Sequence, residues 1–119
     1  MIKLNGQLRV TGESGRHYFF NLHFFHPAHK PHIEDKQGIY IFIKKKNSGK
    51  YDTIYAAQTT NLARRINQLN RGNCIFNKKP NRVCILAESS KELRISILED
   101  ILANPKYEFR YNELLADIL

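Results

Sequence analysis

The chain has 119 residues, which fits one domain and leaves no room for a second hydrophobic core. Its formal net charge is +8, and its 42% of hydrophobic and 25% of charged residues are ordinary for a globular protein. No apolar run is long enough to cross a bilayer and the first residues lack the core of a signal peptide, so we expect a cytoplasmic protein that does not act in a membrane.

The N-terminal third predicts a β-hairpin followed by an irregular loop. Apolar residues recur from Leu4 to Val10, and they alternate strictly from Tyr18 to Phe24, which is the period of a strand. Between these runs, the segment Gly12–Gly15 has the composition of a turn. The segment His26–Gln37 contains two prolines and is therefore expected to be a loop.

Three strands are predicted in the middle of the chain. Gly38–Ile43 is a short apolar run, and a polar turn at Asn47–Lys50 leads to a second strand near Thr53–Ala57. The run Arg82–Glu88 is apolar at its centre and reads as a third, buried strand.

A helix is predicted between the second and third of these strands. Apolar residues recur at helical spacing from Leu62 to Leu69. Either Thr60 or Asn61 can cap the start of this helix, and Gly72 is expected to end it.

A second helix is predicted after the third strand. Ser89 followed by Glu92 is a capping box, and the apolar residues from Leu93 to Ile101 continue the helix until Pro105 ends it. A last amphipathic segment covers residues 114–118. The order of elements predicts an α/β (α+β) fold, with a small mixed or antiparallel central sheet flanked by helices.

Positive charge is concentrated in one third of the chain. Residues 44–82 carry ten Lys and Arg against one acid, Asp52, so their net charge is +9, compared with +2 before them and −3 after them. This distribution predicts a surface for a polyanion such as DNA, and the alternative is a solvated basic face. The predicted nucleic-acid-binding residues are Lys44, Lys45, Lys46, Arg64, Arg71, Lys78, Lys79 and Arg82.

Two triplets and one arginine resemble the signature of a known family. Gly38-Ile39-Tyr40 begins the first central strand, Tyr55-Ala56-Ala57 lies in the second, and Arg65 follows Tyr55 by ten positions. In this order, the segment from Gly38 to Asn112 resembles the GIY-YIG nuclease superfamily. The resemblance implies a GIY-YIG-like domain at residues 38–119, with residues 1–37 as an N-terminal extension of a single domain.

The resemblance also implies an activity. It indicates a DNA endonuclease that hydrolyses phosphodiester bonds with one Mg²⁺ or Mn²⁺ ion, held by Glu99, and no small-molecule cofactor. The planar fork of Arg65 can bind phosphate oxygens, and a single carboxylate with waters is a usual way to hold Mg²⁺. Tyr40 can act as general base where nearby cations lower its pKa from about 10. Tyr55 then contacts the water or phosphate, and Asn112 orients one of these groups.

Each candidate also has a purely structural interpretation. A tyrosine on a strand is usually a core residue, and an Asn such as Asn112 more often caps a turn or helix. Glu99 shares a side of its helix with Ile95 and Leu102, which predicts that it is half-buried.

The chain departs from the family at two places. Ala56-Ala57 replaces the usual Ile-Gly, and Ala57 adds a methyl group that narrows the site where family members need close approach or freedom of the backbone. One turn after the arginine, where family members often carry His or Tyr, this chain has Gln68 and no titratable group. The alternative function is therefore a catalytically decayed module that binds nucleic acid without cutting it.

The N-terminal extension is rich in aromatic residues. They predict either a base-stacking platform or, as in most hairpins, one core face and one interface face. A third hypothesis is therefore a protein-interaction domain that forms a homodimer or docks a targeting partner. The aromatic residues are Tyr18, Phe19, Phe20, Phe24 and Phe25.

Histidines and cysteines do not predict a metal centre. Four of the five histidines lie between His23 and His32, where Pro27 and Pro31 prevent a helix from aligning them. No acid or cysteine is interleaved with them, so a DNA-contacting loop is expected rather than a zinc site. The two cysteines are too few for a disulfide framework, and we expect reduced thiols.

Overall fold

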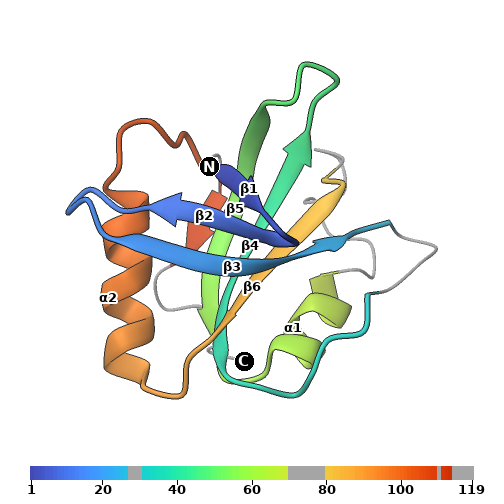
Figure 1. Cartoon of the computed structure of the whole chain (residues 1–119). Coiled ribbons are helices and arrows are strands. Elements are labelled where there is room, and N and C mark those ends of the chain that lie inside the picture. The colour runs from blue at the N-terminus through green and yellow to red at the C-terminus, as the bar shows by residue number, and fades with distance from the viewer. Residues whose placement is uncertain (27–30, 70–79, 110, 114–119) are drawn as a thin grey trace.

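The described residues form one curved sheet with a helix on each face (Figure 1). Figure 1 shows a computed structural model of the whole chain, in which residues 1–26, 31–69, 80–109 and 111–113 are described. The helices are α1 (Leu62–Leu69) and α2 (Lys91–Leu102). The seven strands of this part of the chain are β1 (Ile2–Leu4), β2 (Gln7–Thr11), β3 (His17–Phe24), β4 (Gly38–Lys45), β5 (Tyr51–Thr59), β6 (Arg82–Ala87) and β7 (Tyr111–Glu113).

The mixed α+β class predicted from the sequence is confirmed. The strand order is β1-β2-β3-β6-β4-β5-β7, and all neighbours are antiparallel except β5 and β7, which are parallel. The N-terminal hairpin joins the central strands because β3 pairs with β6, with Leu22 opposite Cys84. The extension at residues 1–37 therefore contributes strands to the central sheet.

The first apolar run is two strands rather than one. Asn5 and Gly6 separate β1 from β2, and both have positive φ angles, of 48° and 80°. Asn-Gly is the sequence best suited to a tight hairpin turn with two such residues. The predicted hairpin of β2 and β3 is confirmed, with the turn after Gly12 closed by the Gly12 N–H donating to the Arg16 carbonyl.

Strand β4 lies at the centre of the sheet, between β6 and β5. Its residues from Gly38 to Ile43 are all buried, as the continuous apolar run predicts. Gly38 has no room for a side chain, because a Cβ atom would collide with the Leu86 carbonyl oxygen and lie 2.8 Å from Leu62 Cδ1. The glycine thus permits β6 and the start of α1 to approach β4 closely.

The two faces of β4 contribute to two different hydrophobic cores. Tyr40 and Phe42 pack with Ile66 of α1, whereas Ile41 packs with Leu98 of α2. We call these the α1-side core and the α2-side core. Side chains alternate between the faces of a strand, so a sheet covered on both sides needs apolar residues at every position.

The N-terminal hairpin covers the α2-side core. Leu8, Val10 and Phe20 are fully buried there beside Ile101 of α2. In Figure 1, β2 and β3 cross over β4 at a large angle, which curls this end of the sheet around that core. Cys84 is also buried in it, as a free thiol whose pKa is raised to about 12 by burial. Cys74 lies outside the described residues.

Helix α2 begins one residue later than the capping box predicted. Ser90, not Ser89, is the N-cap, and its Oγ accepts a hydrogen bond from the Leu93 N–H at 3.3 Å. The carboxylate of Glu88, which precedes the helix, accepts from the Ser90 N–H at 2.9 Å, a role that the capping box assigns to an acid inside the helix. The helix ends before Pro105, as predicted.

The buried face of α2 contains an arginine. The side chain of Leu93 is 51% exposed, whereas that of Arg94 is 1% exposed. Arg94 Nε donates to Gln58 Oε1 at 2.9 Å, and its Nη1 donates to Gln37 Oε1 at 2.7 Å and to the carbonyls of Glu88 and Ser89. Because a buried charge must be satisfied, this arginine fixes the loop before β4, strand β5 and the start of α2 relative to one another.

The end of α2 is hydrogen-bonded to the N-terminal hairpin. Asp100 accepts from the Ser14 hydroxyl at 2.6 Å, the Ser14 N–H at 2.9 Å and the Tyr18 hydroxyl at 2.7 Å. Burial alone raises the pKa of Asp100. The hydrogen bonds and the charge of Arg16 together lower it by a larger amount, so the pKa of Asp100 is below its ordinary value. Burial and the contact with Asp100 raise the pKa of Tyr18 to about 12.

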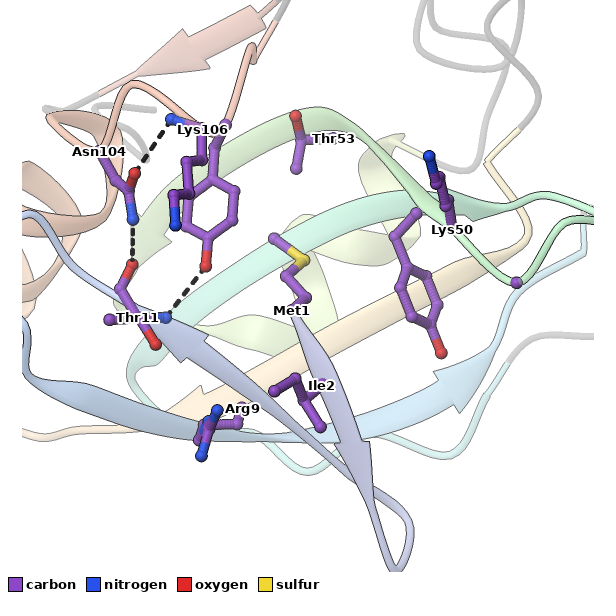
Figure 2. Close-up of a pocket in the computed structure, with 11 residues that line it drawn as sticks. Met1, Ile2, Arg9, Thr11, Lys50, Thr53, Asn104 and Lys106 are labelled. Carbon is purple, nitrogen blue, oxygen red and sulfur yellow. Dashed lines mark hydrogen bonds between the residues drawn. The ribbon is translucent and has the colours of Figure 1, made fainter.

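The loop after α2 holds the end of β2. Asn104 Nδ2 donates to the Thr11 carbonyl at 2.8 Å, and the Thr11 N–H donates to the Tyr107 hydroxyl at 3.1 Å (Figure 2). The pairing of β1 with β2 ends at Ile2 opposite Arg9. The two bonds to Thr11 therefore supply hydrogen-bond partners for the backbone of β2 beyond the end of β1.

The remaining predictions concern the ends of the elements. Asn61 caps α1, since its Oδ1 accepts from the Arg64 N–H at 3.0 Å, and the buried face at Leu62, Ile66 and Leu69 is confirmed. The predicted stop at Gly72 and the segment 114–118 lie outside the described residues, and the short strand β7 was not predicted. No helix in the described ranges combines the length and apolar composition needed to span a bilayer.

Candidate functional site

Tyr40 and Tyr55 lie next to each other on the α1 side of the sheet. Their ring centroids are 5.9 Å apart and the rings are tilted by 39°. Tyr40 lies opposite Ala57 on β5, and Tyr55 lies opposite Phe42 on β4, so the two tyrosines occupy diagonal positions of one antiparallel pair. Both are buried, at 0% and 7% exposure. This diagonal spacing is within reach of aromatic side chains.

Helix α1 brings Arg65 to both tyrosines. Burial alone lowers the pKa of the half-buried Arg65 guanidinium, but interactions with the hydroxyls of Tyr40 and Tyr55 raise it, and the net pKa is above normal. Arg65 Nη1 also donates to Gln68 Oε1 at 3.4 Å. The guanidinium is therefore permanently charged and is held by neighbours on three elements. We call Tyr40, Tyr55 and Arg65 the tyrosine–arginine cluster.

Both departures from the family pattern lie beside this cluster. Ala57 is fully buried in the α1-side core, directly opposite Tyr40. Its methyl group therefore lies on the same face of the sheet as the Tyr40 ring. Gln68 stands where family members often carry a titratable residue, and its amide oxygen accepts the hydrogen bond from Arg65. A neutral amide can orient the arginine but cannot exchange a proton at neutral pH.

Glu99 is not brought into the cluster. Its helix packs through Leu98 and Ile101 on the α2-side core, whereas Tyr40 and Tyr55 belong to the core on the opposite face of the sheet. Glu99 is also exposed, so the predicted half-burial is wrong. The apolar face of α2 is centred on residues 94, 98 and 101 and leaves position 99 in solvent.

The described residues do not provide a metal site at the cluster. Among them, no three His, Cys, Asp or Glu side chains are grouped closely enough to hold an ion. Because Mg²⁺ can bind through one or two carboxylates, the position of Glu99 matters more than this absence. An exposed carboxylate on the opposite face does not fit as a ligand for an ion beside Arg65, and we derive no step through a metal.

Asn112 is placed by its backbone alone. It belongs to β7, where it pairs with Ala56 of β5, and the preceding residue, Tyr111, pairs with Tyr55. The chain thus returns at the end to the strand that carries Tyr55. This return was not predicted as a strand, because three residues are too few for a periodic pattern.

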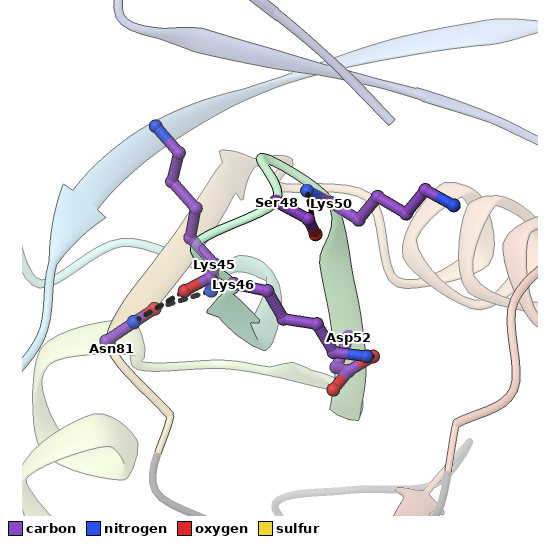
Figure 3. A network of polar contacts seen from close by, with 6 residues as sticks. All are labelled: Lys45, Lys46, Ser48, Lys50, Asp52 and Asn81. Carbon is purple, nitrogen blue, oxygen red and sulfur yellow. Dashed lines mark hydrogen bonds and ion pairs between the residues drawn. The ribbon is translucent and has the colours of Figure 1, made fainter.

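The basic turn between β4 and β5 is ordered by polar contacts (Figure 3). Asn81 Oδ1 accepts from the Lys45 N–H at 2.7 Å, and Asn81 Nδ2 donates to the Lys45 carbonyl at 3.1 Å. Lys46 Nζ lies 3.0 Å from Asp52 Oδ1, and both side chains are about half exposed. Exposed ion pairs contribute little to stability, so this one mainly neutralises Asp52, the acid in the basic segment.

The other predicted DNA-binding residues differ in position. Lys44 and Lys45 are half-buried at the end of β4, and Arg64 is exposed on α1 beside Arg65. Arg82 lies over the ring of Phe24, with its Cζ 4.1 Å from the ring centroid. The predicted residues Arg71, Lys78 and Lys79 lie outside the described residues.

The aromatic residues of the hairpin do not form one platform. Phe20 and Phe25 are buried, in the α2-side and α1-side cores respectively. Phe19 and Phe24 are exposed, at 44% and 76%. Phe20 and Phe24 share one face of β3 because side chains alternate along a strand, so the predicted division into one core face and one interface face does not hold along the whole hairpin. Phe24 is the most exposed of these aromatic residues.

Sequence reasoning did not single out Arg94, although it is the largest fully buried side chain in the described part of the chain. An arginine in the first turns of a helix usually faces solvent, so its sequence position carries no signal.

Comparison with known proteins finds no family model that matches the chain, no curated protein of similar sequence and no solved structure that matches it.

Proposed function

We propose that the chain binds DNA and that Arg65 contacts a backbone phosphate at the tyrosine–arginine cluster. The observation that carries this proposal is that the half-buried guanidinium of Arg65 interacts with the hydroxyls of two buried tyrosines. A fixed planar fork loses little side-chain entropy when it binds phosphate oxygens, and it stays charged at any physiological pH.

The surroundings of the cluster support an anionic ligand. Arg64 is exposed on the same helix, and the half-buried Lys44 lies four residues beyond Tyr40, roughly 13 Å along an extended strand. The acid in this basic segment, Asp52, is paired with Lys46. Backbone phosphates are regularly spaced anions, so cations separated in this way suit a nucleic acid better than a single small anion.

Binding to labelled duplex, branched and single-stranded DNA by fluorescence anisotropy, over a range of salt concentrations, tests this proposal. We expect affinity to fall linearly with the logarithm of salt concentration. Arg65→Ala is expected to weaken binding roughly tenfold and to reduce the salt slope by about one. The matched control is Arg64→Ala, which removes an equal charge from the exposed neighbour. Equal loss in both variants would mean that Arg65 has no special role.

A second candidate is a metal-dependent endonuclease of the GIY-YIG type. The specific observation in its favour is the contact of Tyr40 with Arg65, because a neighbouring cation stabilises a phenolate that can accept a proton from water. The fully buried ring and the position of Glu99 favour the binding function as the first candidate.

The two candidates differ in what happens to DNA after binding. Plasmid and branched DNA are incubated with the protein, with and without Mg²⁺ or Mn²⁺, and strand breaks are measured on denaturing gels. Metal-dependent cleavage that disappears in Tyr40→Phe and Arg65→Ala would establish the endonuclease. Cleavage that Glu99→Ala leaves intact would assign the metal ligand elsewhere. Salt-dependent binding without strand breaks would support the DNA-binding function and count against the endonuclease.

A further inference from the structure

A pocket of about 560 Å³ lies on the α2 side of the sheet (Figure 2). Three segments far apart in the sequence form its walls: the N-terminal strands β1 and β2, the turn between β4 and β5 with the start of β5, and the loop after α2. Met1, Tyr51 and Tyr107 line it and also pack against the α2-side core. The pocket is therefore separated by the sheet from the tyrosine–arginine cluster.

The charged side chains that line this pocket are all cationic. Arg9, Lys50 and Lys106 come from the three different wall segments, and no acid lines the pocket in the described part of the chain. Two acids adjoin lining residues in the sequence: Asp52, which is paired with Lys46, and Glu108, which is exposed. Burial and the charges of Arg9 and Lys106 lower the pKa of the Met1 amino group, consistent with a positive potential inside the pocket.

The polar wall of the pocket is rigid. The Lys106 N–H donates to Asn104 Oδ1 at 3.0 Å, while Asn104 Nδ2 and the Tyr107 hydroxyl bind both backbone groups of Thr11. Arg9 differs from these residues: its Nε is buried and has no hydrogen-bond partner among the described residues. A buried donor without a partner is costly, so the Arg9 side chain is expected to favour an acceptor that can reach its guanidinium.

We propose that this pocket binds a nucleotide that carries one phosphate, either as a free nucleoside monophosphate or as the phosphorylated end of a DNA strand. The cations and the hydroxyl of Thr53 suit a phosphate, which alone would fill only part of the volume. Tyr51, Tyr107 and the aliphatic side chain of Met1 supply the apolar and aromatic surface that a base and sugar require. The volume lies within the usual range for small-molecule sites, about 300–1,000 Å³.

This proposal goes beyond DNA binding at Arg65 and can fail separately from it. The phosphate group has two possible sources, a free nucleotide and the phosphorylated end of a DNA strand. Isothermal titration of the full chain therefore uses deoxyadenosine monophosphate and deoxyadenosine, and then one short oligonucleotide with and without a terminal phosphate. We expect each phosphorylated probe to bind more tightly than its unphosphorylated counterpart, and the tighter phosphorylated probe identifies the source.

Substitutions assign the binding to the pocket. Arg9→Gln and Lys106→Gln are each expected to weaken binding of the phosphorylated probe roughly tenfold. Lys91→Gln, on the exposed side of α2, is the matched control and is not expected to change this affinity. Amide chemical shifts of the unaltered protein provide a readout that needs no variant, and Thr11 and Tyr107 are expected to move most.

Three results would overturn the proposal. The first is that neither phosphate increases affinity. The second is that Arg9→Gln and Lys106→Gln, both folded by circular dichroism, bind as tightly as the original chain. The third is that deoxyadenosine monophosphate causes its largest chemical-shift changes at Tyr55 and Arg65, which would mean that the free nucleotide occupies the tyrosine–arginine cluster instead.

Discussion

The ring of Tyr40 lies 5.9 Å from the ring of Tyr55, centroid to centroid, across the pair of strands β4 and β5. Both hydroxyls interact with one guanidinium from α1, so two tyrosines buried among apolar side chains share a single cationic partner. The arrangement therefore couples the sheet to α1 and fixes the orientation of Arg65.

Removing the hydroxyl of Tyr40 or of Tyr55 is expected to increase the mobility of the Arg65 side chain without creating a cavity in the core. Tyr40→Phe and Tyr55→Phe keep the ring but delete one interaction each, and we expect DNA affinity to fall about threefold to tenfold because the guanidinium loses its fixed orientation. Anisotropy titrations measure this effect. Tyr51→Phe is the control, since Tyr51 lies on the α2 side. An unchanged affinity in both cluster variants would show that the tyrosines do not position Arg65.

Gly38→Ala is expected to destabilise the protein by about 1–3 kcal/mol, as overpacking of a tight contact usually does. The added methyl group would meet the Leu86 carbonyl oxygen and approach Ala87 Cα to 3.1 Å, and backbone atoms cannot rotate away. Urea unfolding monitored by circular dichroism gives the change in free energy. Ala57→Gly is a control that removes a methyl group from the neighbouring strand. If Gly38→Ala unfolds at the original midpoint, β6 does not approach β4 as closely as described.

Arg94→Met is expected to lower the free energy of unfolding by roughly 2–4 kcal/mol, because it leaves the amide oxygens of Gln37 and Gln58 and two carbonyls without their donor. Arg94→Lys keeps the charge but not the planar fork, so it is expected to recover only part of the loss. Lys91→Met, on the exposed side of the same helix, is expected to be nearly neutral. A neutral Arg94→Met would mean that apolar packing replaces the hydrogen bonds.

The contact between Tyr18 and Asp100 predicts two changes of stability with pH. The pKa of Asp100 is lowered in the folded state, so its contribution is complete above the ordinary value of 3.8 and is lost as the pH falls below it. The pKa of Tyr18 is raised to about 12, so its contribution is complete below 10.0 and is lost as the pH rises from there.

Urea unfolding at several pH values, compared between the original chain and two variants, checks both changes. Asp100→Asn is expected to flatten the acidic limb and Tyr18→Phe the alkaline limb, relative to the original chain. The comparison with variants matters because other tyrosines and lysines also titrate at alkaline pH. Identical pH profiles in all three proteins would show that this contact does not couple folding to protonation.

The strands and α1 could be predicted because their signals are local. The apolar run at Gly38–Ile43, the turn at Asn47–Lys50 and the helical spacing from Leu62 to Leu69 each depend on a few neighbouring residues. The Asn5-Gly6 turn has an equally local signal, but the prediction of a single first strand did not use it. The N-cap of α2 was misplaced by one residue because two serines stand in succession and only the end of β6 decides between them.

The candidate site divides in the same way. The contact of Tyr40, Tyr55 and Arg65 follows from a paired hairpin and the helix after it, which are adjacent in the chain. The position of Glu99 depends on which face of the sheet α2 covers, and no pattern within the helix determines that face. The burial of Arg94 depends on acceptors from Gln37 and Gln58, more than thirty residues away in sequence.

The pairing of β3 with β6 has a consequence for how the chain folds. It joins the N-terminal hairpin to a strand on the far side of two strands and a helix, so the native contacts have a high contact order. The entropy of closing a long loop is lost before these contacts contribute favourable free energy. Domains of this kind therefore fold in milliseconds to seconds rather than microseconds. Before Leu8, Val10 and Phe20 pack, the edge of β6 is unpaired and the α2-side core is exposed to solvent. Strands of different molecules can pair at this edge while the hairpin is not yet in place.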